Sequence, residues 1–151
     1  MRNLNEFDAV FVDLDDTLIH GFMTDLMDIT WKNFKNQNIA TLLATIQSKF
    51  KLYKINHKLI YMLNNCSRPI YILTARKPLK ATFDLVQDIL PKAILVEMSS
   101  QCPYVDKIEY IRDKDYEKTI IFDDNKYTRL NADLQDILAI DPTPMFEEVV
   151  E

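Results

Sequence analysis

The stretch FDAVFVDLDDTL, residues 7–18, joins a short apolar run to a cluster of carboxylates. Residues 7–12 are rich in aromatic and β-branched side chains, the composition that suits a pleated and buried strand. The run stops at Asp13, Asp15 and Asp16. We therefore predict that residues 7–12 form the first strand of the fold and that this strand ends at a carboxylate cluster.

Strand and helix patterns alternate along the rest of the chain. Short apolar runs predict strands at residues 70–73, 93–96, 118–122 and 137–141. Helical periodicity and capping residues predict helices over about 24–36, 39–50 and 56–65, after Pro78, after Pro103, and near 126–135. This alternation favours an α/β fold, a doubly wound, Rossmann-like parallel sheet of about five strands with helices on both faces and right-handed crossovers.

Two of these helices carry an apolar stripe. In the helix over 39–50 the residues that share one face, at spacings typical of an amphipathic helix, are Ile39, Leu42, Leu43, Ile46 and Phe50. In the helix after Pro78 they are Leu79, Phe83, Val86 and Leu90, before Pro91 ends the pattern.

Length and composition indicate one globular domain spanning residues 1–151. Hydrophobic residues make up 48% of the chain and charged residues 27%, which is ordinary for a folded soluble protein. No apolar run approaches the roughly 20 residues that a membrane span needs. Cys66 and Cys102 have neither zinc-site nor disulfide-framework spacing. We expect a reduced, cytoplasmic protein without a membrane segment.

The polar residues that could take part in binding or catalysis follow the predicted strands. Asp13 and Asp15 follow the first strand, Thr74 follows the strand at 70–73, and Asp123 and Asp124 follow the strand at 118–122. Ligands in such sheets bind beyond the carboxyl ends of the strands, where the strand order reverses. We therefore predict that these residues form one site.

Carboxylates gathered at one point repel each other and raise each other's pKa values unless a cation compensates their charge. A set of oxygen ligands without His or Cys favours Mg²⁺ over Zn²⁺. We predict a Mg²⁺ site with Asp13, Asp15, Asp123 and Asp124 as ligands. Asp124 is either a direct ligand or a residue that supports one.

A phosphate held by such a metal would place Asp13 as a nucleophile and Asp15 as general acid and then general base. Thr74 offers a hydroxyl to a phosphoryl oxygen, and a lysine near the site would neutralise charge in the transition state. Lys107 is the first candidate for this lysine, with Lys77 and Lys80 as alternatives.

Taken in order, these motifs resemble those of the haloacid dehalogenase superfamily of phosphohydrolases. The D-x-D-x-T motif of that family matches residues 13–17, its strand-end Ser or Thr matches Thr74, its lysine matches Lys107, and its final acidic pair matches Asp123 and Asp124. The resemblance implies a Mg²⁺-dependent phosphatase with an aspartyl-phosphate intermediate. Because the leaving alcohol needs a proton, the presence of Asp15 favours phosphate transfer over dehalogenation.

Other functions remain open at this stage. A receiver domain of two-component signalling also has an acidic pair, a phospho-accepting Asp, a Thr and a Lys, but its acidic pair comes first and its lysine last. A phospho-accepting regulatory or binding protein with little turnover is a further alternative. So is a phosphatase that acts on a sugar phosphate or a phosphoprotein.

Charge is segregated along the chain. Residues 29–83 contain ten Lys or Arg and no Asp or Glu, so this block carries +10 while the rest carries −15. The block is either a solvated surface or a basic rim that attracts an anionic substrate. It overlaps residues 20–55, which we interpret as a small helical cap inserted between the first two motifs.

Aromatic residues are interleaved with these lysines, namely Trp31, Phe34, Phe50 and Tyr53. They either pack within the insertion or stack on bases beside phosphate-binding lysines. The triplet Thr74-Ala75-Arg76 resembles the Ser/Thr-x-Arg of the phosphatase half of phage polynucleotide kinase-phosphatases. This resemblance implies a nucleotide or the phosphorylated end of a nucleic acid as substrate, with Arg76 contacting its phosphate or sugar.

Overall fold

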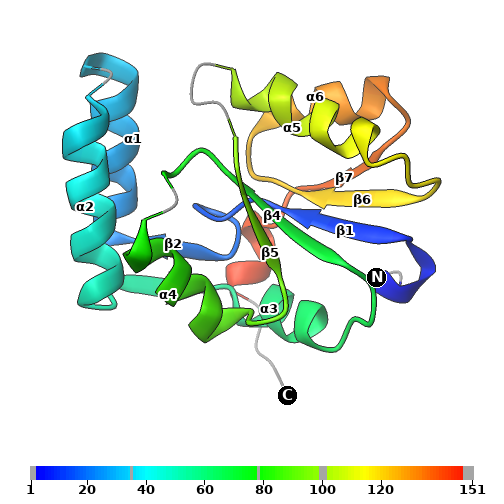
Figure 1. Cartoon of the computed structure of the whole chain (residues 1–151), viewed down its shortest axis with the longest axis horizontal. Helices are drawn as coiled ribbons and strands as arrows, with labels where there is room; N and C mark the ends of the chain where they lie inside the picture. Colours follow the sequence, from blue (N-terminus) through cyan, green and yellow to red (C-terminus); the bar gives the residue numbers. More distant parts are fainter. Residues whose placement is uncertain (1–2, 35, 78, 99–101, 148–151) are drawn as a thin grey trace.

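The computed structural model describes residues 3–34, 36–77, 79–98 and 102–147 (Figure 1), without the side chains of Phe22, Lys32, Phe34 and Glu147. Its centre is a five-stranded parallel sheet with the strand order β5-β4-β1-β6-β7. The strands are β1 (Ala9–Val12), β4 (Ile70–Thr74), β5 (Ile94–Glu97), β6 (Thr119–Phe122) and β7 (Leu138–Ile140). The predicted doubly wound α/β fold is confirmed.

Helices cover both faces of this sheet. One face carries α3 (His57–Asn64), α4 (Lys80–Ile89) and the 3-10 helix η2 (Thr143–Glu147), and the other carries α5 (Pro103–Asp113) and α6 (Lys126–Leu134). A short 3-10 helix, η1 (Leu4–Glu6), precedes β1. Among the described residues, no helix combines the length and the apolar composition that a membrane span requires.

Strand β1 supplies side chains to both halves of the core. Val10 and Val12 pack among the residues under α3 and α4, whereas Ala9 and Phe11 pack among those under α5 and α6. All four are fully buried. A strand covered on both faces needs apolar residues at every position, which explains why residues 9–12 show no polar alternation.

The order of the strands fixes the position of a ligand site. From β1 the chain moves outward through β4 to β5, then returns to the other side of β1 to form β6 and β7. The direction therefore reverses between β1 and β6, which are paired from Ala9↔Thr119 to Val12↔Phe122. This is the point where doubly wound sheets bind their ligands.

The insertion after the first motif contains two strands as well as two helices. Strand β2 (Ile19–Gly21) leads into α1 (Phe22–Phe34) and α2 (Gln37–Lys49), and β3 (Tyr53–Ile55) pairs antiparallel with β2. The α1–α2 hairpin stands to one side of the sheet (Figure 1). The two strands were missed because segments of three residues are too short to show a period.

Asn56 ties this insertion to the core. Its backbone N–H donates to the Leu18 carbonyl at 2.8 Å, and its buried amide donates to the Thr17 carbonyl at 3.0 Å. The same side chain accepts from the Leu59 N–H and so caps α3. One side chain therefore joins the carboxylate loop, the end of the insertion and the start of a core helix.

The predicted stripe on the second helix is wrong in part. Ile39, Leu42 and Phe50 are 46%, 57% and 62% exposed, while Ala44 and Gln47 are the buried residues of α2. The larger apolar side chains of this face of α2 therefore point to solvent. Phe83 of α4 is also exposed, although Val86 and Leu90 are buried as predicted. Pro78, expected in the first turn of that helix, lies outside the described residues.

Gly21 is the one glycine of the sequence, and the insertion has no room for a side chain there. A Cβ at this position would lie 2.2 Å from the Leu52 carbonyl oxygen and 2.9 Å from Gln47 Oε1. We predict that Gly21→Ala lowers the free energy of unfolding by about 1–3 kcal/mol, because the backbone of β3 must move. Denaturant unfolding measures this. Lys54→Ala, at an exposed position of β3, is the control, and equal stability of the two variants would contradict the prediction.

Candidate active site

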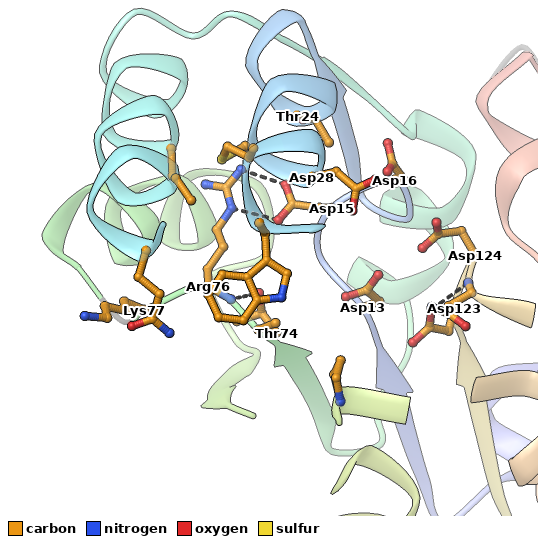
Figure 2. Close-up of a pocket in the computed structure, with 18 of the residues that line it drawn as sticks. Asp13, Asp15, Asp16, Thr24, Asp28, Thr74, Arg76, Lys77, Asp123 and Asp124 are labelled. Carbon is orange, nitrogen blue, oxygen red and sulfur yellow. Dashed lines mark hydrogen bonds and ion pairs between the residues drawn. The ribbon is translucent and has the colours of Figure 1, made fainter. Parts of the chain in front are cut away.

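A cavity of about 500 Å³ lies between the carboxyl ends of the strands and the α1–α2 hairpin. All seven residues predicted for the site line it, namely Asp13, Asp15, Thr74, Arg76, Lys107, Asp123 and Asp124. Figure 2 shows Asp13 between the Asp123–Asp124 pair on one side and Asp15 with Arg76 on the other. The predicted convergence of these residues is therefore observed.

Lys107 holds two of the carboxylates together. Its ammonium lies 2.7 Å from Asp123 Oδ2 and 3.1 Å from Asp13 Oδ1, and the side chain is buried. Burial lowers the pKa of Lys107, but the two carboxylates outweigh it and hold the pKa above its ordinary value. Lys107 is therefore charged. The alternative Lys80 does not line the cavity and instead pairs with Asp84 on α4.

The acidic pair after β6 is held rigidly. Asp123 Oδ1 accepts from the Asn125 N–H at 2.9 Å, and Asn125 caps α6. Arg129 donates to the backbone carbonyls of Asp123 and Asp124. The Thr17 hydroxyl lies within 3.5 Å of Asp124 Oδ1, so the first motif also contacts the last.

The carboxylates carry more negative charge than Lys107 compensates. Burial raises the pKa of Asp13 well above its ordinary value; Lys107 lowers it, and Asp123 and Asp124 raise it again. Burial likewise raises the pKa of Asp124 to about 6, with Asp123 adding to the increase. Both shifts indicate that this side of the cavity would be stabilised by a further cation.

The donor atoms suit a hard divalent cation. One carboxylate oxygen from each of Asp13, Asp123 and Asp124 lies within 4.8 Å of the others. Oxygen ligands together with uncompensated charge fit Mg²⁺, which completes its shell with water and substrate oxygens. The Asp15 carboxylate, predicted as a fourth ligand, is not in this group and has a different partner.

Asp15 is held by Arg76. The guanidinium donates from Nε to Asp15 Oδ2 at 2.8 Å and from Nη2 to Oδ1 at 2.7 Å, a bidentate arrangement. A third contact, from Nη1 to the Ser48 hydroxyl at 3.4 Å, reaches α2. Arg76 is 8% exposed, so its contact with Asp15 fixes the orientation of the carboxylate.

Thr74 is the last residue of β4 and lies in the turn that also carries Arg76. Its buried hydroxyl accepts a hydrogen bond from the Arg76 N–H at 3.0 Å. Because this bond uses a lone pair, the hydroxyl proton can be donated to a ligand in the cavity. The turn after β4 therefore positions both a hydroxyl and a guanidinium.

The positive charges of the basic block contribute little to the cavity. Of its lysines and arginines with described side chains, Arg76 and Lys77 line the cavity, whereas Lys49, Lys51 and Lys80 surround a separate surface hollow. Lys32 and Lys35 belong to the block but fall outside the described side chains. The described lysines therefore do not form the basic rim over Asp13 that the sequence suggested.

Several contacts that shape the site were not predicted from the sequence. Thr17, Asn56 and Arg129 hold the loops through hydrogen bonds to residues distant in the chain or to backbone carbonyls. Asp16 has a positive φ of 63° and contacts His20 of β2. Asn56 and Asn125 both carried a usable signal, because an Asn before a helical pattern indicates an N-cap.

Neither the comparison with protein-family models nor the comparison with curated proteins finds a match to this chain. Function is therefore inferred from the order of the motifs and from the geometry of the cavity.

Metal binding at this site can be tested because the metal and protons compete for the same carboxylates. The pKa of Asp124 is raised to about 6 from 3.8, so the metal-free folded state binds this proton more tightly and loses stability as pH rises between these values. Mg²⁺ binds the deprotonated carboxylates. We predict that millimolar Mg²⁺ raises the Tm by several degrees at about pH 7.5 and much less at about pH 5.

Differential scanning fluorimetry with and without Mg²⁺ measures this difference. Asp124→Asn should reduce the effect at the higher pH, and Asp133→Asn, at an exposed position of α6, should leave it unchanged. An equal Tm increase at both pH values would contradict a carboxylate metal site.

Proposed function

We propose that this protein is a Mg²⁺-dependent phosphomonoester hydrolase that forms an aspartyl-phosphate on Asp13. The observation that carries the proposal is the arrangement around Asp13. Its carboxylate lies 3.1 Å from Lys107, next to the Asp123–Asp124 pair, and lines a cavity together with Asp15. The order of the four motifs supports the same function.

In the first step a carboxylate oxygen of Asp13 attacks the phosphorus atom, and the bond from phosphorus to the ester oxygen breaks. Asp15 gives a proton to the leaving oxygen, so the product is a neutral alcohol. Each Asp15 oxygen accepts one bond from Arg76 and keeps a second lone pair that can carry this proton.

In the second step a water molecule gives a proton to Asp15 and attacks the phosphorus. The bond from phosphorus to Asp13 breaks, which releases inorganic phosphate and returns both carboxyl groups to their starting forms. The same side chain therefore acts first as acid and then as base.

Several groups of the cavity can neutralise or stabilise the negative charge of the phosphoryl group. Lys107 presents its ammonium beside Asp13, and Thr74 can donate its hydroxyl to a phosphoryl oxygen. Asp13, Asp123 and Asp124 would hold Mg²⁺, which when bound neutralises phosphoryl charge and the repulsion between these carboxylates.

The substrates proposed from the sequence are a nucleotide or the phosphorylated end of a nucleic acid. A sugar phosphate or a phosphoprotein is the alternative within the same chemistry. A phospho-accepting regulatory protein is the alternative of another class, and it differs in one observable, a phosphorylated form that persists without release of phosphate.

The nucleophile is tested by Asp13→Asn. We predict that wild-type protein with Mg²⁺ releases phosphate from a panel of nucleoside, sugar and oligonucleotide phosphates, and that Asp13→Asn lowers kcat by about 10³-fold or more. Phosphate release and acid-stable labelling of the protein are measured together.

The control is Asp133→Asn, which should retain full activity. Activity that survives Asp13→Asn would exclude this residue as nucleophile. A persistent label without phosphate release in the wild-type protein would favour the regulatory function.

The role of Arg76 is tested by Arg76→Lys. Lysine keeps the charge but cannot donate two parallel hydrogen bonds to Asp15. We predict a decrease in kcat of about 10- to 100-fold with little change in KM, because Arg76 acts on the substrate through Asp15. Arg68→Lys, at an exposed position, is the matched control. An increase in KM at unchanged kcat would show that Arg76 binds the substrate directly, as the sequence suggested.

A further inference from the structure

The end of the cavity under the α1–α2 hairpin differs in chemistry from the end that holds the carboxylates. Each helix turns one stripe toward it, at the spacing i, i+3, i+4, i+7 that places residues on one helix face. The stripe of α1 is Thr24, Met27, Asp28 and Trp31, and that of α2 is Gln37, Ala40, Thr41 and Ala44. The hairpin is therefore a wall of the cavity.

This wall is mostly uncharged. Trp31 presents a half-buried indole to the cavity, and the small side chains of Ala40 and Ala44 leave space beside α2. Thr41 adds a hydroxyl that can form a hydrogen bond. An aromatic surface with neutral polar groups and one carboxylate, Asp28, suits a flat, uncharged molecule and not a second phosphate.

The charges of the cavity limit how much anion it accepts. Its described lining holds six carboxylates and three cations. Two of these cations, Arg76 and Lys107, are already paired with Asp15, Asp13 and Asp123. A ligand with one phosphate at Asp13 and a neutral body matches this pattern, whereas further phosphates would meet net negative charge.

We infer that the hairpin end of the cavity is a nucleobase subsite and that the substrate is a mononucleotide, with its phosphate at Asp13 and its base stacked on Trp31. This rests on the proposed phosphatase function, and it narrows the substrate from nucleotides and nucleic-acid ends in general to a single nucleotide. A cavity of about 500 Å³ lies within the range of small-molecule sites.

Binding is tested without turnover in the Asp13→Asn protein with Mg²⁺. Trp31 is the one tryptophan of the sequence, so intrinsic fluorescence reports directly on this position. We expect adenosine 5'-monophosphate or adenosine 3'-monophosphate to quench it and to bind at least about tenfold more tightly than ribose 5-phosphate, because base stacking on an aromatic ring contributes about this factor. An end-phosphorylated trinucleotide should bind more weakly than the mononucleotide.

The role of Trp31 is tested by calorimetry and kinetics on variants. Trp31→Ala should reduce the preference for adenosine monophosphate over ribose 5-phosphate by about tenfold, and Trp31→Phe should retain most of it. Phe50→Ala, which removes an exposed aromatic residue of the same insertion outside the cavity lining, is the control and should keep the preference.

The results separate the subsite from the proposed activity. Quenching by a mononucleotide without hydrolysis of any ester would support the subsite and reject the phosphatase function. Hydrolysis without a preference for mononucleotides over ribose 5-phosphate would overturn the subsite and leave the phosphatase function intact. An equal loss of affinity for the mononucleotide and for ribose 5-phosphate in Trp31→Ala would do the same. Tighter binding of the trinucleotide would overturn the assignment to a single nucleotide.

Discussion

The rest of the site depends on a buried ammonium between two carboxylates. Lys107 reaches from α5 to Asp13 at the end of β1 and to Asp123 at the end of β6, so it joins the two strands where the sheet reverses direction. Without it these largely buried carboxylates would face each other without a compensating charge. Removing one member of such a buried group leaves an uncompensated charge, which is more costly than losing an exposed ion pair. The same contact therefore supports both the chain fold and the charge balance of the cavity.

A second ion pair, between Arg76 and Asp15, gives the carboxylates different surroundings. The Arg76 guanidinium directs Asp15 away from the cluster of Asp13, Asp123 and Asp124, although Asp13 and Asp15 are two residues apart. On the proposed function, one group would hold a cation and the other would move a proton. Carboxyl groups take different roles when their surroundings differ, and here the difference comes from which cation each one contacts.

The sequence predicted those features that depend on neighbouring residues. The apolar runs predicted as strands at 7–12, 70–73 and 118–122 became the central strands, and the carboxylates after them met at one edge, because parallel strands end on the same side of a sheet. It could not predict the contact of Arg76 with Asp15, which joins residues sixty-one apart, nor the inner face of α2. That face is lined by Ala40 and Ala44 beside a cavity, so hydrophobicity alone selected the exposed side of the helix.

The way the insertion joins the core bears on how readily the insertion could be exchanged. Ile19 pairs with Ile55, so the chain leaves the core and returns to it at adjacent points, and Asn56 secures the return. An excursion with neighbouring ends constrains the length of the segment between them only weakly. The α1–α2 hairpin can accordingly be exchanged for a different one while the strands and the carboxylates stay in place. On the proposed function, selection could then change the molecule that is recognised separately from the reaction that is performed on it.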